Sequence, residues 1–215
     1  MPQIVLDPAD ITTTGTWKSP SVIPRRIRNF GRFPNVDDWQ PGDLILFSAI
    51  KPGFMSRQII EAQKRADYHE DDARWHHAAI FAGRTHICEA VPAGVTHREI
   101  YDYVSTHLIR VRRAPDLTRD QGWQLLVHAM VHIGKRYSFT SAAKLGVMSF
   151  RRFGARTDTR PPKGMMVCSQ LFVDAYSMLT GEVLWEPQAV ETPAFLSATP
   201  KLRDVSTHWC EITRQ

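Results

Sequence analysis

One predicted helix limits the folds open to this chain more than any other feature. Residues 165–180 follow a Pro/Gly-rich segment, 160–164, and carry apolar residues at helical spacing until Gly181 supplies a stop. Such a helix is stable only when its apolar side is buried against other elements. The pattern therefore predicts a helix packed on a core, with Cys168 in its first turn and a buried side formed by Val167, Leu171, Phe172, Ala175 and Leu179.

The position of Cys168 has a chemical consequence. Unpaired backbone N–H groups at the start of a helix favour a thiolate over a thiol, and the thiolate is the reactive form of a cysteine nucleophile. The alternative is structural, since free cysteine is among the side chains most often buried in cores. A nucleophile also requires a base, so the choice depends on whether the chain supplies one.

Three segments read as strands of an antiparallel sheet. Residues 44–47 follow the turn at 41–43, and residues 75–82 and 85–90 are joined by Gly83-Arg84, which suits a tight hairpin. Side chains alternate between the two faces of a strand. The hairpin can therefore place His77 and Glu89 on one shared face, with His76 pointing the other way.

His77 and Glu89 have the chemistry that a cysteine nucleophile needs. An imidazole holds the thiol ionised and later protonates the leaving group, while a third polar group fixes the orientation of the ring. The chain has 9 histidines, so composition alone does not select one. We favour His77 because a carboxylate is correctly phased on the next strand, and His76 is its main rival.

The remaining segments give weaker predictions. Residues 56–66 read as a short helix capped by Ser56, residues 69–72 as an acidic loop, and residues 108–112 as a strand with Arg110 and Arg112 facing away from the core. A capping box at Thr118 and Gln121 starts an amphipathic helix. Its predicted apolar side is Trp123, Leu126, Val127 and Met130, and its His128 and His132 are expected on a wetted face rather than on a metal.

Length and composition are those of an ordinary globular protein. The 215 residues suit a single domain over 39–215, preceded by an irregular extension over 1–38. No apolar run reaches the roughly 18–20 residues of a membrane span, and no signal peptide is recognisable, so a cytoplasmic location is the default, with signal-less export left open. The net charge of +5 is spread along the chain without a nucleic-acid-binding motif, so no nucleic-acid partner is expected.

The order of these motifs resembles a known family. Residues 42–45, 77–83, 89–95, 134–137 and 167–171 are similar to the circularly permuted papain-like amidases related to bacterial cell-wall peptidases, the permuted NlpC/P60 proteins of the YiiX/YaeF type. In that family the histidine and the glutamate precede the cysteine, whereas ordinary papain-like enzymes have the cysteine first. The resemblance covers roughly residues 41–180, and its departures are Gln170, where an acidic residue is common, and Ala79, where glycine is frequent.

The resemblance implies a fold and a set of site residues. The expected fold is α+β and permuted papain-like, with a small antiparallel sheet packed against helices and the nucleophile at a helix N-terminus. It implies Cys168 as nucleophile, His77 as base and acid, Glu89 as orienting group, and Tyr137 as a residue that positions substrate or stabilises the oxyanion. No metal or organic cofactor is implied.

The function that follows is thiol-dependent hydrolysis of an amide, isopeptide or acyl bond, with peptidoglycan peptides among the candidate substrates. One alternative is a lipid-directed acyltransferase or acyl hydrolase of the same superfamily, in peripheral contact with a membrane. It is suggested by apolar residues inside the basic segment 147–164 and just before it, namely Leu145, Val147, Met148 and Phe150. The other alternative is a non-catalytic binding module with the same fold. The substrate and the oligomeric state are left open.

Overall fold

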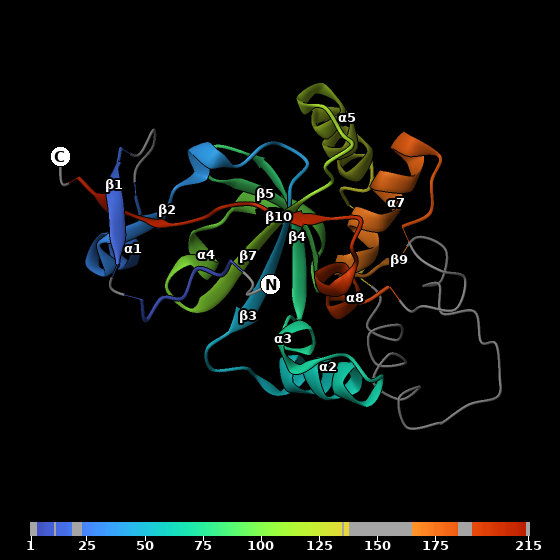
Figure 1. Ribbon diagram of the computed structural model, residues 1–215, viewed down its shortest axis with the longest axis horizontal. Coiled ribbons are helices and arrows are strands. Elements are labelled where there is room, and N and C mark those ends of the chain that lie inside the picture. Colours follow the sequence, from blue (N-terminus) through green and yellow to red (C-terminus); the bar gives the residue numbers. More distant parts are fainter. Residues whose placement is uncertain are drawn as a thin grey trace.

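A six-stranded antiparallel sheet forms the centre of the molecule (Figure 1). The computed structural model describes residues 4–10, 12–18, 23–134, 136–137, 165–184 and 191–213. The predicted strand and hairpin are present, and a third strand follows the hairpin directly. In spatial order the sheet contains β10 (Arg203–Asp204), β7 (His107–Arg113), β3 (Leu44–Ala49), β4 (His77–Gly83), β5 (His86–Val91) and β6 (Gly94–Glu99).

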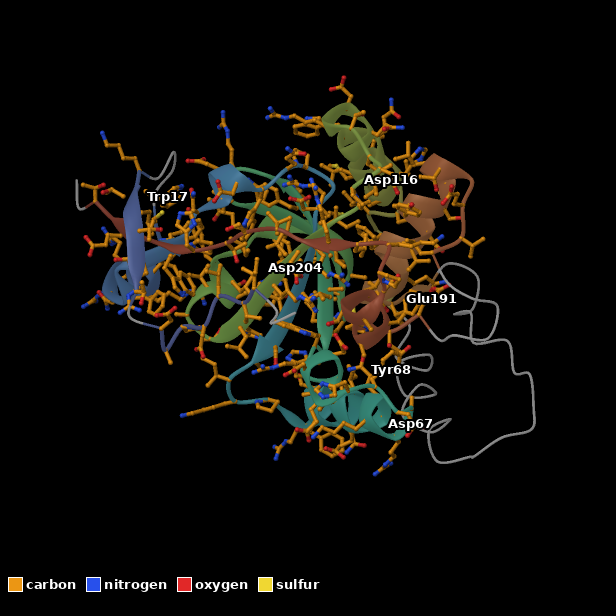
Figure 2. All side chains as sticks on the ribbon, viewed as in Figure 1. Trp17, Asp67, Tyr68, Asp116, Glu191 and Asp204 are labelled. Carbon is orange, nitrogen blue, oxygen red and sulfur yellow. The ribbon has the colours of Figure 1, made fainter. Side chains whose placement is uncertain are left out.

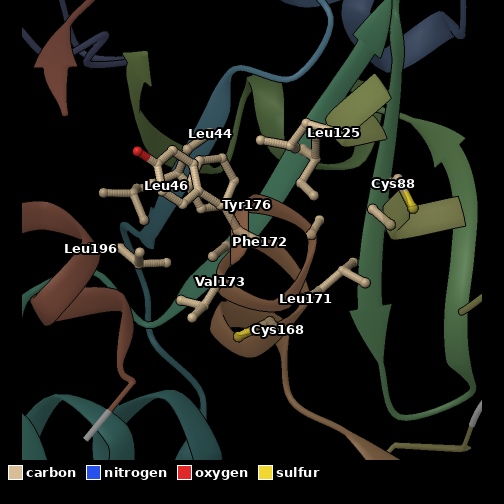
Figure 3. Close-up of a cluster of buried hydrophobic side chains, with 14 of the residues drawn as sticks. Leu44, Leu46, Cys88, Leu125, Cys168, Leu171, Phe172, Val173, Tyr176 and Leu196 are labelled. Atoms are coloured by element: carbon tan, nitrogen blue, oxygen red, sulfur yellow. The ribbon is translucent and has the colours of Figure 1, made fainter. Parts of the chain in front are cut away.

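Three helices cover one face of this sheet, namely α5 (Arg119–Met130), α7 (Cys168–Thr180) and α8 (Pro193–Ala198). The helix predicted from 165–180 is α7, and Gly181 ends it in the left-handed conformation at φ 70°. Figure 3 shows Leu171, Phe172 and Tyr176 of this helix among leucines of the neighbouring elements. Because these side chains are buried, α7 is fixed on the sheet and Cys168 has a defined position.

A second, three-stranded sheet covers the other side of the molecule. It is formed by β1 (Thr13–Trp17), β11 (Trp209–Ile212) and β2 (Arg32–Pro34), and is accompanied by α1 (Arg25–Phe30), the 3-10 turn η1 (Val36–Asp38) and α4 (Tyr101–Val104). The irregular conformation predicted for 1–38 is therefore wrong for much of that segment. Its hydrophobic residues lack a local period because they are buried in a shared core with distant residues, as Trp17, Ile27 and Phe33 are.

Other predicted boundaries also need correction. Helix α2 (Phe54–Arg65) is capped by Gly53 and not by Ser56. The segment predicted as an acidic loop contains a short helix, α3 (Glu70–Ala73), with the His69 side chain accepting a hydrogen bond from the Asp71 N–H. A short parallel pair, β8 (Arg136–Tyr137) with β9 (Met165–Met166), precedes α7. Within the described part of the chain, no helix has the length and apolar character needed to cross a membrane.

The capping box of α5 is present, but its predicted apolar side is only half right, because Leu126 is buried and Met130 packs against the core while the other two residues are not buried. Trp123 and Val127 are exposed, whereas Gly122 and Leu125 are buried. The backbones determine this orientation, because a Cβ at Gly122 would lie 2.2 Å from the carbonyl oxygen of Pro41. Gly122 of the helix therefore faces the loop before β3. His132, just beyond the end of the helix, is buried and not exposed to water as predicted.

The two arginines of β7 were predicted to face away from the core, and both are buried. Arg110 pairs with Asp204 at 2.7 Å, and Arg112 Nη1 donates to the Leu196 carbonyl oxygen at 2.8 Å. Figure 2 places Asp204 on the strand that crosses the centre of the molecule. The guanidinium groups satisfy carbonyls at the end of α8, which explains how two charges are accommodated there.

Candidate active site

The β4–β5 hairpin brings His77 and Glu89 together. Ala79 lies opposite Glu89 in the antiparallel register, so His77 and Glu89 are diagonal neighbours on one face. His77 Nε2 lies 2.6 Å from Glu89 Oε2, and the Glu89 side chain is fully buried. The shared face predicted from strand alternation agrees with this register.

Helix α7 places Cys168 beside the same histidine. Val167 is the N-cap in an extended conformation and Cys168 is the first helical residue, with 5% of its surface exposed. Its thiol lies close enough to His77 to interact with the imidazole and favour the protonated ring. Nε2 of that ring faces Glu89, so Nδ1 is the ring nitrogen left for the thiol. Figure 3 shows Cys168 at the start of α7, away from the end that carries Tyr176.

The surroundings of His77 and Glu89 favour the charged form of each side chain. Burial opposes a charge on His77, but hydrogen bonds with Cys168 and Glu89, and the charges of both, raise its pKa to about 10. Burial likewise opposes ionisation of Glu89, but the hydrogen bonds from His77 and Tyr103 and the nearby positive charges hold its pKa below the usual value. At neutral pH His77 is therefore an imidazolium beside an ionised Glu89.

Glu89 has two further partners that the sequence did not suggest. The Tyr103 hydroxyl of α4 donates to Glu89 Oε2 at 2.6 Å, and Arg98 Nε of β6 lies 3.3 Å from Oε1. The Tyr103 ring stacks on Phe47 with centroids 3.9 Å apart, and on His77 at 5.7 Å. The carboxylate and the imidazole are thus held from several elements at once.

His76, the rival base, has a different role. Its Nε2 accepts a hydrogen bond from the Ala49 N–H at 2.9 Å. Burial, followed by the charges of His77 and His107, lowers the pKa of His76 to about 3. A neutral ring whose nitrogen is already bonded to the backbone is a poor candidate for a general base.

The start of α7 also offers hydrogen-bond donors. The first bond within the helix runs from the Leu171 N–H to the Val167 carbonyl at 3.2 Å. The N–H groups of Cys168, Ser169 and Gln170 therefore have no carbonyl of their own helix to bind. Donors in this position suit an oxygen that becomes negatively charged next to the nucleophile.

Several predicted residues are placed only in part. The backbone of Tyr137 is paired with Met166, two residues before Cys168, so β8 ends close to the start of α7. The side chain of Tyr137 lies outside the described residues, as do the segment 147–164 and Leu145. The role predicted for Tyr137 and the lipid interface predicted for that segment stay predictions.

One missed residue had a usable signal in the sequence. Glu89 lies opposite Thr96 in the β5–β6 register, so Arg98 is its diagonal neighbour on the same face. Assigning a strand to 94–99 would have placed Arg98 beside Glu89. Tyr103 had no such signal. Its short helix, α4, follows β6, and its side chain reaches the carboxylate only through tertiary packing.

Comparisons with known proteins identify the fold. No protein-family model matches the chain, and no curated protein matches it. The crystal structure of the metalloprotein YiiX from Escherichia coli O157:H7 is similar, with a TM-score of 0.53 at 20% sequence identity, covering 77% of this chain and 96% of that chain. The chain has a YiiX-like fold. At this identity the similarity concerns the arrangement of antiparallel strands and helices and not the chemistry.

The description of YiiX as a metalloprotein applies to that protein. In the described ranges of this chain, no group of three or more His, Cys, Asp or Glu side chains is arranged to hold a metal ion. The side chains around Cys168 instead interact with one another, since His77 Nε2 is engaged with Glu89 and the same ring interacts with the Cys168 thiol.

Proposed function

We propose that the protein is a cysteine hydrolase with a circularly permuted papain-like domain, which cleaves an amide, isopeptide or acyl bond through an acyl-enzyme. The observation that carries the proposal is the contiguous series Cys168–His77–Glu89, with Cys168 at the start of α7. The series has the nucleophile, base and orienting group that thiol hydrolysis requires. The YiiX-like fold supports the proposal because it matches the family suggested by the motif order.

The chemistry proceeds in two halves. The Cys168 thiolate attacks the substrate carbonyl carbon, and the oxygen takes the negative charge beside the N–H groups at the start of α7. The tetrahedral species collapses as His77 Nδ1–H protonates the leaving amine or alcohol, leaving a thioester on Cys168. Water then attacks the thioester while His77 takes its proton, and collapse returns the acid product and the thiolate–imidazolium pair.

Acyl-enzyme trapping tests this proposal with generic activated substrates, so the natural substrate need not be identified first. Wild-type protein is incubated with p-nitrophenyl acetate and a set of peptide p-nitroanilides, and intact mass is followed with time. We expect a burst of nitrophenol and an acyl adduct that maps to Cys168, both absent in Cys168→Ala and strongly reduced in His77→Ala. His86→Ala is the matched control, since His86 begins the next strand and is expected to leave the burst unchanged.

The outcomes separate the alternatives. A burst that persists in folded Cys168→Ala protein would refute the hydrolase proposal. No adduct with any ester or anilide, in folded wild-type protein, would favour the non-catalytic binding module. Turnover of esters but not of anilides would direct the substrate search to acyl lipids, the alternative suggested by the sequence.

A further inference from the structure

Glu89 is held by more contacts than a simple orienting group needs. Its Oε2 receives both the Tyr103 hydroxyl and His77 Nε2 at 2.6 Å, and its Oε1 faces Arg98 at 3.3 Å. The carboxylate is completely buried, so water cannot replace a missing partner. Each of these partners, two hydrogen-bonded and one ion-paired, therefore affects both the charge of the group and the direction in which it points.

Tyr103 and Arg98 are themselves anchored on different elements. Tyr103 is fixed by its stacked contact with Phe47, whose ring centroid lies 3.9 Å away. Arg98 forms an ion pair with Asp102, and Asp102 also pairs with Arg26. Arg26 belongs to α1, in the N-terminal segment. A continuous series of polar contacts thus runs from that segment to His77.

We propose that Tyr103 and Arg98 are positioning residues of the site, which keep the Glu89 carboxylate ionised and aimed at His77, and that Arg26 supports Arg98 through Asp102. The inference rests on the proposed function, because it assigns a purpose to the orientation of His77. Neither residue touches the thiol in this scheme. Both act through Glu89.

Charge alone and positioning make opposite predictions for Arg98. Removing a cation from the neighbourhood of an imidazolium would by itself make that imidazolium more stable. Losing the alignment of Glu89 would make it less stable, because the hydrogen bond to Nε2 would be weakened. A loss of thiolate character at Cys168 after removal of Arg98 therefore reports alignment rather than simple repulsion.

Several titratable or charged groups surround the Glu89 carboxylate and influence its titration. They are His77 on β4, Arg98 on β6, Tyr103 on α4, and the more distant His107 on β7, while Cys88 is adjacent on β5 itself. Burial raises the pKa of Glu89, whereas His77, Tyr103 and Arg98 together lower it. Removal of the Tyr103 hydroxyl or of the Arg98 charge moves that pKa upward, so the acidic limb of any profile that needs the carboxylate moves to higher pH.

The test is the rate of iodoacetamide labelling at Cys168 between about pH 5 and about pH 9, compared with the midpoint of about 8.5 for a free thiol. Tyr103→Phe keeps the stacked ring and removes only the donor. We expect its labelling rate at about pH 6 to fall about tenfold, the effect of one hydrogen bond to a charged group, with the acidic limb displaced upward. Tyr101→Phe, on the same helix, is the control.

The second part of the labelling test uses substitutions of Arg98 and Arg26. Arg98→Gln is expected to slow labelling at about pH 6 by about tenfold, and Arg98→Lys, which keeps the charge, to restore part of the rate. Arg26→Gln is expected to have a smaller effect of about threefold, typical of an exposed pair. Arg28→Gln, on the same helix as Arg26, is expected to have none.

The two proposals fail in different ways. If folded wild-type protein shows no fast labelling of Cys168 near about pH 6, the thiolate–imidazolium pair and the proposed function both fail. If wild type labels fast and folded Tyr103→Phe and Arg98→Gln keep its rate and profile, only the positioning inference is overturned. Thermal melts and circular dichroism establish folding, and Tyr103→Phe decides the matter if Arg98→Gln does not fold.

Discussion

Replacing Glu89 with glutamine removes one negative charge from the centre of the site and leaves the side-chain volume nearly unchanged. The carboxylate is fully buried and accepts hydrogen bonds from His77 and Tyr103 on one oxygen. A glutamine amide has one acceptor oxygen and one donor nitrogen. It therefore meets at least one of the surrounding donors with a donor of its own, and it no longer stabilises an imidazolium.

The magnitude follows from the two hydrogen bonds. A bond to a charged group contributes about 1.5–3 kcal/mol and a neutral one about 0.5–1.5 kcal/mol, so two such bonds lose about 2–3 kcal/mol when the charge is removed. Since about 1.4 kcal/mol corresponds to a factor of ten, the population of the thiolate–imidazolium pair is expected to fall roughly a hundredfold.

The assay is iodoacetamide labelling of Cys168 at about pH 6, where an ordinary thiol is almost entirely protonated. Glu89→Gln is expected to label roughly a hundredfold more slowly than wild type. Glu99→Gln is the matched control, since this residue lies on the neighbouring strand β6, away from Glu89, and its side chain accepts a long hydrogen bond of 3.4 Å from the Thr85 hydroxyl. Wild-type labelling in folded Glu89→Gln protein would show that the carboxylate does not sustain the ion pair.

The remaining predictions concern the backbone contact, the second buried thiol and the alkaline limb. Gly122→Ala places a Cβ 2.2 Å from the Pro41 carbonyl oxygen, so urea unfolding is expected to show a loss of about 1–3 kcal/mol, and an unchanged midpoint would refute the contact. Burial, with the charge of Glu89, raises the pKa of Cys88 to about 12, so peptide mapping should find it unlabelled in folded protein. Turnover is expected to decline as the pH rises through about 10, because His77 then loses the proton that the leaving group needs. The stability that the charge of His77 contributes is complete below its ordinary pKa of 6.5 and is lost as the pH rises from there through about 10. Flat activity and melting profiles across this range would contradict the assignment.

Local patterns were informative wherever one element contains its own signal. The period of α7, its stop at Gly181 and the capping box of α5 are all properties of short segments, and all are present in the structure. Strand alternation also gave the shared face of His77 and Glu89, because a tight hairpin leaves little freedom in the register. These features were predictable since neighbouring residues decide them.

Errors arose where a distant segment decides the outcome. The orientation of α5 depends on Gly122 meeting the loop at Pro41, and the buried state of Arg112 depends on carbonyls some 84 residues away. Neither partner can be inferred from the segment itself. The residues 13–34 read as irregular for the same reason, because the partner of β1 is the distant strand β11.

The sequence by itself determined the candidate nucleophile, its base and its orienting group, because each depends on a helix start or on strand alternation within a hairpin. The tertiary structure decided how those groups are charged and supported. Tyr103 and Arg98 reach Glu89 from two other elements, and the burial of the carboxylate keeps water away from it. The charge state of a buried group depends on all its neighbours in space, and only folding brings those neighbours together.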